Sequence, residues 1–282
     1  MRCFLAEYSL SFNPHVSIEN AVTDDFHNRF GGIARLYGIA TLEKFSKSHV
    51  MVVGLGGVGS WTVEALARSG VGKLSLVDLD DLCVTNTNRQ IHATTQSIGQ
   101  SKATALAQRV ALINPEAEVI SHQSFYTEAN AEALLADQPD ALVDAIDSVR
   151  SKCHLLATCK ERRIPVIASG GAGGRTDATK IQIDDLSKTH GDALLLSVRR
   201  KLRLEYRFPK ADQKKSPKFK IAAVFSPEPP RFPTCDGDTT TVRPDTIVPG
   251  IKCDAGYGAV THITATFGNL MAGWILDQLA SQ

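Results

Sequence analysis

Short apolar runs alternate with helically spaced apolar residues between positions 49 and 170. The runs are rich in Val, Ile and Leu and predict β-strands at 49–54, 73–78, 117–122, 141–146 and 165–170. The segments between them repeat their apolar residues at a period near 3.6 and predict helices at 57–70, 101–114, 128–136 and 148–163. Strands separated by helices pair in parallel, and the helices then cover both faces of the sheet. The pattern predicts an α/β fold with a Rossmann-like, mostly parallel sheet.

The pattern changes after Gly174. Two more strands, with a basic helix between them, are predicted at 179–186, 194–206 and 219–226. A loop rich in proline and glycine follows over 226–256, and the last segment places apolar residues at helical spacing, namely Ile263, Phe267, Leu270 and Trp274. We therefore divide the chain into an N-terminal extension, a Rossmann-like nucleotide-binding part and a C-terminal part with mixed strands, over 1–27, 28–174 and 175–282.

The composition is that of an ordinary globular protein, with 43% hydrophobic and 22% charged residues. The net charge is +1, so any site for nucleic acid must be local. None of the six cysteines belongs to a CxxC pair, which argues against a paired-CxxC zinc site and a thioredoxin-type redox motif. Scattered thiols are typical of the reducing cytosol, so we expect a cytoplasmic protein.

One segment, 255–276, lacks Lys, Arg, Asp and Glu over 22 positions and is long enough to span a bilayer. The segment is not strongly hydrophobic, because it contains four glycines, three threonines, His262 and Asn269. We therefore expect no membrane span and predict a helix that is buried in the core or in a dimer interface.

A glycine-rich turn links the first predicted strand to the first predicted helix. Gly54, Gly56, Gly57 and Gly59 permit a tight turn and close approach of the backbone, and the helix N-terminus presents free N–H groups to phosphates. Asp78 ends the next strand, 19 residues after Gly59, where an acidic residue accepts hydrogen bonds from a ribose. This context predicts a nucleotide site; the alternative is a turn that is merely tight.

Residues further along the chain favour one kind of nucleotide. GLGGVG also satisfies the GxGxxG pattern, so an NAD-dependent oxidoreductase is a candidate. Asn86, Arg89 and Lys102 instead suit the charged end of a nucleoside triphosphate. Asp144 and Asp147 follow the fourth strand, where a carboxylate suits Mg²⁺ that bridges phosphates. Each residue alone also fits a helix cap, a solvated side chain or a surface ion pair, but together the set favours a triphosphate.

Basic residues gather in one segment, 199–220. It holds ten Lys and Arg against Glu205 and Asp212, a charge of +8 in a chain of net charge +1. Such concentration is expected of a surface that contacts a nucleic-acid backbone. Tyr206, Phe208 and Phe219 lie among the basic residues, and we expect one of them to stack on an unpaired base. A solvated helix face is the alternative.

Longer motifs carry a family resemblance. The glycine turn with its helix and following strand, then NTNRQ, GQSKA and DAIDS, resembles the ubiquitin-activating-enzyme-like family of ATP-dependent adenylating proteins. More narrowly, the chain resembles the tRNA threonylcarbamoyladenosine dehydratases through RFGGIARLYG, VTNTNRQIHA, DAIDSVRSK, IPVIASGGAGG and CDAGYGAVTHITATFG. These motifs run from about Arg29 to Leu276.

The resemblance implies an activity and a set of roles. The activity is ATP-dependent cyclisation of threonylcarbamoyladenosine next to the anticodon of tRNA, by adenylation of a carboxylate with release of AMP and pyrophosphate. ATP would be lined by Gly54, Gly56, Gly57 and Gly59, its ribose bound by Asp78 and its phosphates held by Asn86, Arg89 and Lys102. Asp147 would hold Mg²⁺. The resemblance and the apolar last helix also imply a homodimer, in which Arg29 or Arg35 reaches the partner's ATP.

Three alternatives stay open from the sequence. The first is an adenylating activator of a ubiquitin-like sulfur carrier, disfavoured because the two CxxC pairs of those relatives are missing. The second and third, an oxidoreductase and a nucleotide-sensing scaffold, are disfavoured by the phosphate-directed residues. Whether a sulfur-transfer protein takes part, and whether Cys235 or Cys253 forms a covalent intermediate, is left open; Cys83 is expected to pack beneath the nucleotide.

Overall fold

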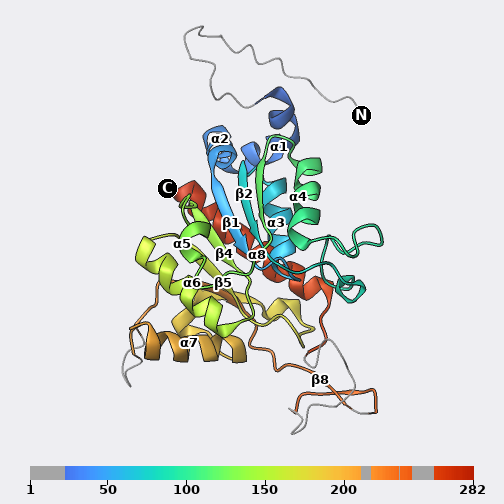
Figure 1. Ribbon diagram of the computed structural model, residues 1–282, viewed down its shortest axis with the longest axis vertical. Helices are drawn as coiled ribbons and strands as arrows, with labels where there is room; N and C mark the ends of the chain where they lie inside the picture. Colours follow the sequence, from blue (N-terminus) through green and yellow to red (C-terminus); the bar gives the residue numbers. More distant parts are fainter. Residues whose placement is uncertain (1–22, 211–216, 235, 243–256) are drawn as a thin grey trace.

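The computed structural model describes residues 23–210, 217–234, 236–242 and 257–282, and one seven-stranded sheet organises them (Figure 1). Its strand order is β3-β2-β1-β4-β5-β7-β6, and all neighbours are parallel except β6 and β7. The strands are β1 (His49–Val53), β2 (Lys73–Val77), β3 (Glu118–His122), β4 (Ala141–Asp144), β5 (Val166–Ser169), β6 (Gln182–Asp185) and β7 (Ala222–Phe225). The predicted fold class, with a mixed C-terminal part, is confirmed.

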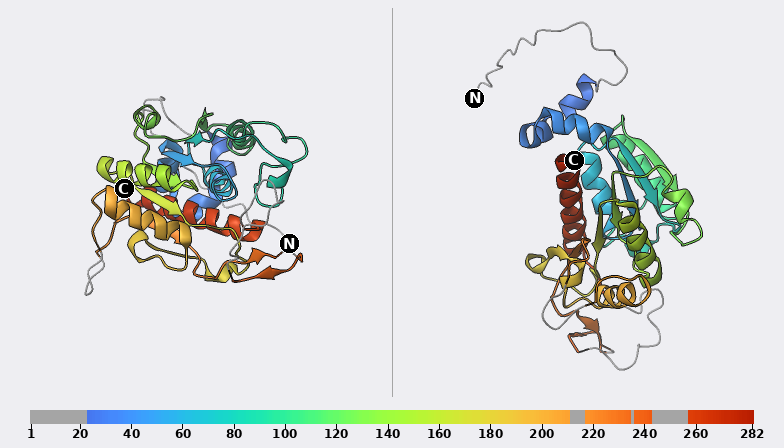
Figure 2. Two further views of the ribbon diagram at one scale, coloured as in Figure 1. Left: turned by 60° about the horizontal axis from the view of Figure 1, so that its bottom comes forward. Right: turned by 90° about the vertical axis from the view of Figure 1, so that its left-hand side faces the viewer.

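Helices cover both faces of the sheet, as the two turned views show (Figure 2). One face carries α3 (Gly59–Arg68), α4 (Lys102–Ile113) and α8 (Thr261–Ser281), and the other carries α5 (Ala131–Leu134), α6 (Val149–Arg162) and α7 (Ala193–Glu205). Strand residues alternate between two apolar cores: Val50 and Val52 face the first group of helices, and Met51 and Val53 face the second. The sheet is thereby buried from both sides.

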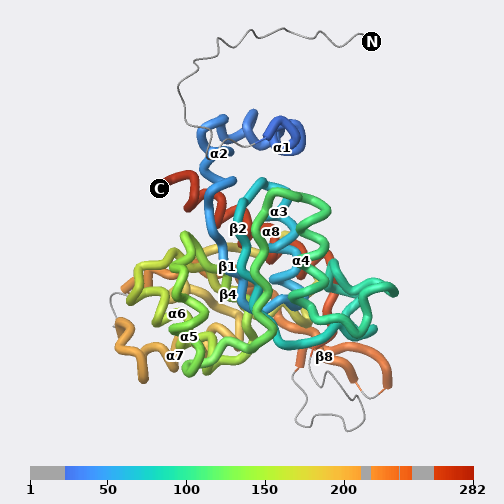
Figure 3. The backbone as a smooth tube through the Cα atoms, turned by 45° about the horizontal axis from the view of Figure 1, so that its top comes forward, coloured from blue at the N-terminus to red at the C-terminus, as the bar shows by residue number. Residues whose placement is uncertain are grey.

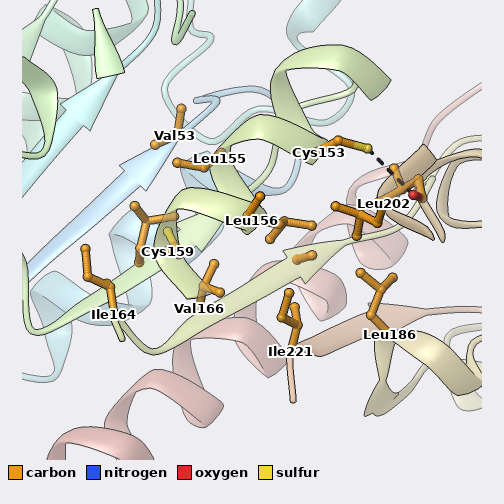
Figure 4. Close-up of a cluster of buried hydrophobic side chains, with 14 of the residues drawn as sticks. Val53, Cys153, Leu155, Leu156, Cys159, Ile164, Val166, Leu186, Leu202 and Ile221 are labelled. Atoms are coloured by element: carbon orange, nitrogen blue, oxygen red, sulfur yellow. Dashed lines mark hydrogen bonds between the residues drawn. The ribbon is translucent and has the colours of Figure 1, made fainter. Parts of the chain in front are cut away.

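The core under α6 and α7 is drawn in close-up in Figure 4. Leu155, Leu156 and Cys159 of α6 are fully buried there beside Leu202 of α7. The thiol of Cys153 donates to the carbonyl of Val198, 3.6 Å away, which ties the two helices together. This core fixes the strand ends from which the site loops leave.

Two helices precede the sheet where no helix was predicted. They are α1 (Asp24–Tyr37), whose N-cap Thr23 accepts a hydrogen bond from Phe26 N, and α2 (Ile39–Lys47). Phe26 and Phe30 pack with Leu42 in a small separate core, and the two helices lie at the end of the molecule that Figure 3 turns forward. The proposed extension over 1–27 thus overlaps α1; its first 22 residues lie outside the described residues.

Two further elements differ from the predicted pattern. Helix α5 covers only Ala131–Leu134, because Asn130 and Thr127 form a hydrogen-bonded turn where the predicted helix would begin. The proline-rich loop contains a short hairpin, β8 (Phe232–Pro233) with β9 (Thr239–Thr240). The rest of that predicted loop, at 243–256, and residue 235 lie outside the described residues.

Candidate functional site

A cavity of about 1040 Å³ opens at the carboxyl edge of the sheet. Its walls come from loops that follow β2, β1, β4 and β5, which are neighbours in that order. From β1 the chain builds the sheet outward through β2 to β3, and from β4 it builds in the opposite direction. The cavity therefore crosses the topological switch point, where open α/β sheets bind their ligands.

The glycines of the turn fall into two pairs: one pair shapes the turn, and the other lines the cavity. A Cβ on Gly59 would lie 1.9 Å from the carbonyl oxygen of Gly54, and Gly54 itself has φ +89°. These two glycines make the turn possible, and neither lines the cavity. Gly56 and Gly57 do line it, and a Cβ on Gly56 would meet nothing within 4 Å. The backbone is bare toward the cavity at Gly56, whereas a Cβ on Gly57 would lie 3.1 Å from Cγ2 of Thr264 and 3.3 Å from Cγ of Arg89.

Asp78 is buried and engaged by the backbone. Its Oδ2 accepts from Leu55 N at 2.7 Å and its Oδ1 accepts from Asp80 N at 2.9 Å. Asp78 thus ties the glycine turn to the end of β2, and Asp80, two residues on, lines the cavity in its place. The predicted ribose contact by Asp78 stays a prediction.

Lys102 begins α4 and reaches back to the acidic end of β2. Its Nζ lies 2.7 Å from Asp80 Oδ2 and 3.9 Å from Asp78 Oδ1. The side chain is almost fully buried, yet it lines the cavity. A phosphate that enters the cavity meets an ammonium group that is already oriented by carboxylates.

Asn86 and Arg89 stand on the loop between β2 and α4. The Oδ1 of Asn86 accepts from Cys83 N at 3.0 Å, and Asn86 lines the cavity beside Gln90. Arg89 Nη1 donates to Thr85 O at 2.8 Å and to Asn88 Oδ1 at 3.0 Å. The structure thus brings Asn86, Arg89 and Lys102 to one cavity, as the sequence predicted for residues that face the same ligand.

Helix α8 fixes the position of Arg89 from the other side. The carbonyl of Arg89 accepts from Trp61 Nε1 at 3.0 Å and from Thr264 Oγ1 at 3.2 Å. Thr261 Oγ1 donates to Asn88 O at 2.6 Å. The long C-terminal helix therefore serves the site, a function that its apolar periodicity did not reveal.

The two aspartates after β4 have separate environments. Asp147 is exposed and lines the cavity, whereas Asp144 is fully buried, with its Oδ2 2.9 Å from Lys152 Nζ. Burial raises the pKa of Asp144, and the ammonium of Lys152 opposes this shift. Only Asp147 is placed to meet a ligand. The described residues contain no group of three or more His, Cys, Asp or Glu side chains that would hold a metal by themselves.

More than half of the residues that line the cavity had no role assigned from the sequence. The loop after β5 contributes residues 169–176, and the C-terminal part contributes Arg231, Phe232 and Tyr257. The motifs that contain most of these residues were noticed only for their family resemblance. No acid, base or phosphate pattern marks them, because they come together only through the pairing of β5 with β7.

The position of Cys83 differs from the expectation. Cys83 is exposed rather than packed under a ligand, and hydrogen bonds from Thr85 lower its pKa. Cys153 and Cys159 are buried, and burial raises the pKa of both thiols. None of these three lines the cavity. Cys235 and Cys253 lie outside the described residues.

The basic segment narrows one prediction: of the three aromatic residues expected to offer a stacking surface, only Tyr206 is partly exposed. Phe219 is fully buried and Phe208 is 5% exposed, and their rings pack edge to face at 4.9 Å. Stacking of an RNA base on either ring is ruled out in this fold, because both belong to the core. The ammonium of Lys160 lies over the ring of Phe208, and the guanidinium of Arg203 lies over the ring of Phe219. Exposed basic side chains remain at Arg200, Arg207, Lys210, Lys218 and Lys220; Lys214 and Lys215 lie outside the described residues.

The fold and the cavity define a doubly wound α/β protein with a phosphate-directed site across its switch point. The ThiF family model matches residues 31–282, so the chain belongs to the ThiF family. The chain is 47% identical over 257 residues to the tRNA threonylcarbamoyladenosine dehydratase of Haemophilus influenzae, covering 91% of this chain and 95% of that protein. It is 41% identical to the dehydratase of the same name from Escherichia coli, covering 93% of this chain and 97% of that one.

Solved structures agree with this relationship. The Escherichia coli dehydratase in complex with ATP superposes with a TM-score of 0.81 at 40% identity, over 93% of this chain and 97% of that one. Its complex with AMP gives the same TM-score at 41% identity. Among the described helices, none combines the length and the apolar character that crossing a membrane requires.

Proposed function

We propose that this protein is an ATP-dependent enzyme that cyclises threonylcarbamoyladenosine in tRNA. The observation that carries the proposal is one cavity of about 1040 Å³ whose wall includes the glycine turn, Arg89, Lys102 and Asp147 and also the loop after β5. The relatives that this chain matches over nearly its whole length are named as tRNA threonylcarbamoyladenosine dehydratases, and one of them is solved with ATP and with AMP.

The chemistry follows from the substrate. A carboxylate oxygen attacks the α-phosphorus of ATP, the bond to the β-phosphate oxygen breaks, and pyrophosphate leaves. The acyl-adenylate now carries AMP as its leaving group in place of oxide. The carbamoyl group of the same side chain attacks the activated carbonyl, AMP departs and a five-membered ring closes. The oxygen lost from the carboxylate leaves with AMP, so the net change in the nucleoside is dehydration.

The enzyme needs no side-chain nucleophile for this sequence. Both attacking groups belong to the substrate, and ring closure within one molecule has a high effective concentration. The described cavity wall contains no cysteine, which accords with a direct mechanism. The work of the protein is to orient two substrates and to stabilise charge on the phosphates.

Each polar residue at the nucleotide end has a task that fits its position. Gly56 and Gly57 let the backbone approach the phosphates, and Arg89 and Lys102 offset their charge. Lys102 would share its ammonium between Asp80 and a phosphate oxygen when ATP binds. Pyrophosphate leaves most readily if both cations contact the β- and γ-phosphates.

Asp147 suits Mg²⁺ that is held mainly by ATP. Mg²⁺ in phosphate-transfer sites takes one or two protein carboxylates and completes its shell with phosphate oxygens and water. One exposed carboxylate on the cavity wall, with Asp144 withdrawn into an ion pair, fits that pattern. Bound there, the ion would neutralise charge on the triphosphate.

We also propose a cytoplasmic homodimer. Neither Arg29 nor Arg35 of α1 lines the cavity of its own chain, so either would act on the partner's ATP rather than its own. Arg29 is held by Asp25 at 2.6 Å, whereas the guanidinium of Arg35 lies beside Gly31 and Gly32. The exposed basic residues at the end of α7 would contact the tRNA backbone.

One assay tests the function against its main alternative. The protein is incubated with ATP and Mg²⁺ and with either tRNA that carries threonylcarbamoyladenosine or a ubiquitin-like sulfur carrier. We expect AMP, pyrophosphate and a nucleoside that is 18 mass units lighter, about the mass of one water, only with the tRNA. Unmodified tRNA is the control, because it lacks the carboxylate. AMP release with the carrier alone would contradict the proposal and favour a sulfur-carrier activator.

A further inference from the structure

We call the part of the cavity wall beyond the residues assigned to phosphates the second lobe. It is lined by residues 169–176, by Arg231 and Phe232, and by Tyr257. These segments follow β5 and β7, across the switch point from the glycine turn. Single small-molecule sites are typically ~300–1,000 Å³, and this cavity of about 1040 Å³ also opens widely around its rim. The cavity thus lies at the upper end of the range for single sites, and its wall extends beyond the residues assigned to phosphates.

Two aromatic rings form one wall of this lobe. The ring centroids of Phe232 and Tyr257 are 5.1 Å apart with planes tilted by 44°. Both residues line the cavity, and Tyr257 is 40% exposed. Phe208 and Phe219, by contrast, are buried in the core, so they are unable to receive a base. The Phe232–Tyr257 pair is thus the aromatic surface that the described cavity wall presents to a flat ligand.

The pair is held in place by the glycine loop after β5. A Cβ on Gly173 would lie 2.8 Å from Cβ of Tyr257, and one on Gly174 would lie 2.8 Å from its Cδ1. Gly174 N donates to Gly258 O at 2.7 Å, and Arg231 N donates to Gly174 O at 2.8 Å. Gly174 is therefore hydrogen-bonded to the residue after Tyr257 and to the residue before Phe232. Such a fixed surface loses little conformational entropy when a ligand binds.

A buried positive charge lies in the same wall. Arg175 is 5% exposed, its Nη2 donates to Gly191 O at 3.1 Å, and its Nε and Nη1 have no hydrogen-bond partner among the described residues. The nearby carboxylates of Asp192 and Glu228 are occupied by backbone N–H groups. Burial lowers the pKa of Arg175, and the charges of Asp192 and Glu228 oppose this shift without cancelling it. An anion in this lobe would supply the missing compensation.

We propose that the second lobe binds the modified nucleoside itself, with its purine packed against the Phe232–Tyr257 pair and its carboxylate attracted by Arg175. This inference rests on the proposed function and deepens it. Unpaired loop bases are recognised by splaying them out and stacking them on aromatic side chains. The carboxylate on the same nucleoside is the anion that the charge of Arg175 favours. Stacking here places the acyl group in the same cavity as the triphosphate.

The aromatic part is tested by Phe232→Leu and Tyr257→Leu. Stacking of a base on an aromatic side chain is worth ~1–3 kcal/mol, which corresponds to a roughly 5- to 150-fold change in affinity. We expect each variant to raise the KM for modified tRNA within that range and to leave the KM for ATP unchanged. Phe125→Leu is the matched control, because Phe125 is 53% exposed and does not line the cavity.

The charge is tested by Arg175→Gln with two anticodon stem-loops, one with threonylcarbamoyladenosine and one with adenosine. We expect the wild-type protein to bind the modified stem-loop more tightly and the variant to lose most of that preference. A variant that merely misfolded would also lose ATP binding and melt earlier, so both are measured. Arg175→Lys, which keeps the charge, should retain part of the preference.

The outcomes separate this inference from the proposed function. If the wild-type protein releases no AMP with modified tRNA, the proposed function fails. If it turns over normally and both leucine variants keep the wild-type KM for tRNA, the stacking assignment fails alone. Loss of binding to a carrier protein in these variants, with unchanged tRNA kinetics, would overturn it in favour of a peptide site.

Discussion

Two buried lysines near the site stand beside aspartates, and their positions give them different functions. Lys102 lies on the cavity wall, 2.7 Å from Asp80, so its charge is within reach of a ligand. Lys152 is fully buried with Asp144, and its Nζ also donates to the carbonyl of Asp144 at 3.2 Å. Lys152 therefore stabilises the turn from which Asp147 projects. The motifs that contain the two lysines, GQSKA and DAIDSVRSK, do not reveal this difference; the position of Lys102 on the cavity wall does.

Asp147→Asn should abolish most of the activity without unfolding the protein. The side chain is exposed on the cavity wall, and its removal from a Mg²⁺–phosphate centre should lower kcat roughly 10²–10⁴-fold, because such charge stabilisation contributes several kcal/mol. The measurement is pyrophosphate release with modified tRNA, alongside thermal unfolding. Asp277→Asn, an exposed aspartate near the end of α8, is the control. Wild-type turnover in the Asp147 variant would remove the metal assignment.

Lys152→Met should destabilise the fold. It leaves the carboxylate of Asp144 buried without its partner, and breaking a buried pair in this way costs about 3–5 kcal/mol. The pKa of Asp144, already raised by burial, would rise further above its unfolded value. The folded state then holds the proton more tightly than the unfolded state, so stability falls as the pH increases between the two pKa values.

Urea unfolding of the Lys152 variant at pH 5 and pH 8 measures this effect. We expect the deficit relative to wild type to be larger at pH 8. The double variant Asp144→Asn/Lys152→Met removes both charges and should recover part of the stability. An equal deficit at both pH values would show that Asp144 does not titrate between them in the variant.

At the scale of elements, most strands and helices between 49 and 170 followed from periodicity, because the long helices bury one apolar stripe and the central strands are apolar on both faces. Helix α1 was missed because only Phe26 and Phe30 are buried on it, too few for a clear period. The nucleotide end of the site was predictable, since its glycines and charges are local in sequence. The second lobe was not, because Arg175, Phe232 and Tyr257 meet only through strand pairing and the bonds of Gly174.

The glycine turn predicts a contrast between two substitutions of the same kind. Gly59→Ala places a Cβ 1.9 Å from the carbonyl oxygen of Gly54, so the backbone must move and both stability and ATP binding should fall. Gly56→Ala meets no protein atom within 4 Å, so its stability should stay within ~0.5 kcal/mol of wild type. Its methyl group points into space that the phosphates need, and ATP affinity should drop.

For both glycine variants, calorimetric titration with ATP measures the ATP affinity, and urea unfolding measures the stability. We expect a loss of stability for Gly59→Ala only and a loss of ATP affinity for both variants. Wild-type ATP affinity in Gly56→Ala would mean that the phosphates do not approach the backbone at that position.

At the scale of the molecule, the site and the basic surface lie at the same end but are separate. Leu194, at the start of α7, lines the cavity, and the exposed basic residues follow the far end of that helix. Thirteen helical residues span about 20 Å at 1.5 Å per residue. Helix α2 leads into the amino end of β1 and so lies at the opposite edge of the sheet (Figure 1). A tRNA whose modified base enters the second lobe would have to extend about 20 Å further to contact the basic residues beyond the far end of α7.

This arrangement makes the salt dependence of tRNA binding a test of the basic surface. Lys210 and Lys218 are exposed at the end of α7 and just before β7, and changing both to Gln removes two charges. If each contacts a phosphate, the slope of log affinity against log salt should become shallower by about 1.4–1.8, at 0.7–0.9 per contact. The affinity for all substrate tRNAs should fall alike, because backbone contacts position the tRNA without specifying its sequence.

The control is Lys44→Gln/Lys47→Gln on α2, which removes the same charge from the far edge of the sheet and should leave the slope unchanged. ATP affinity should match wild type in both double variants, since none of the four lysines lines the cavity. Equal slopes in the two double variants would show that the basic segment is only a solvated face, and the backbone contact would then have to be sought at the cavity rim, around Arg231.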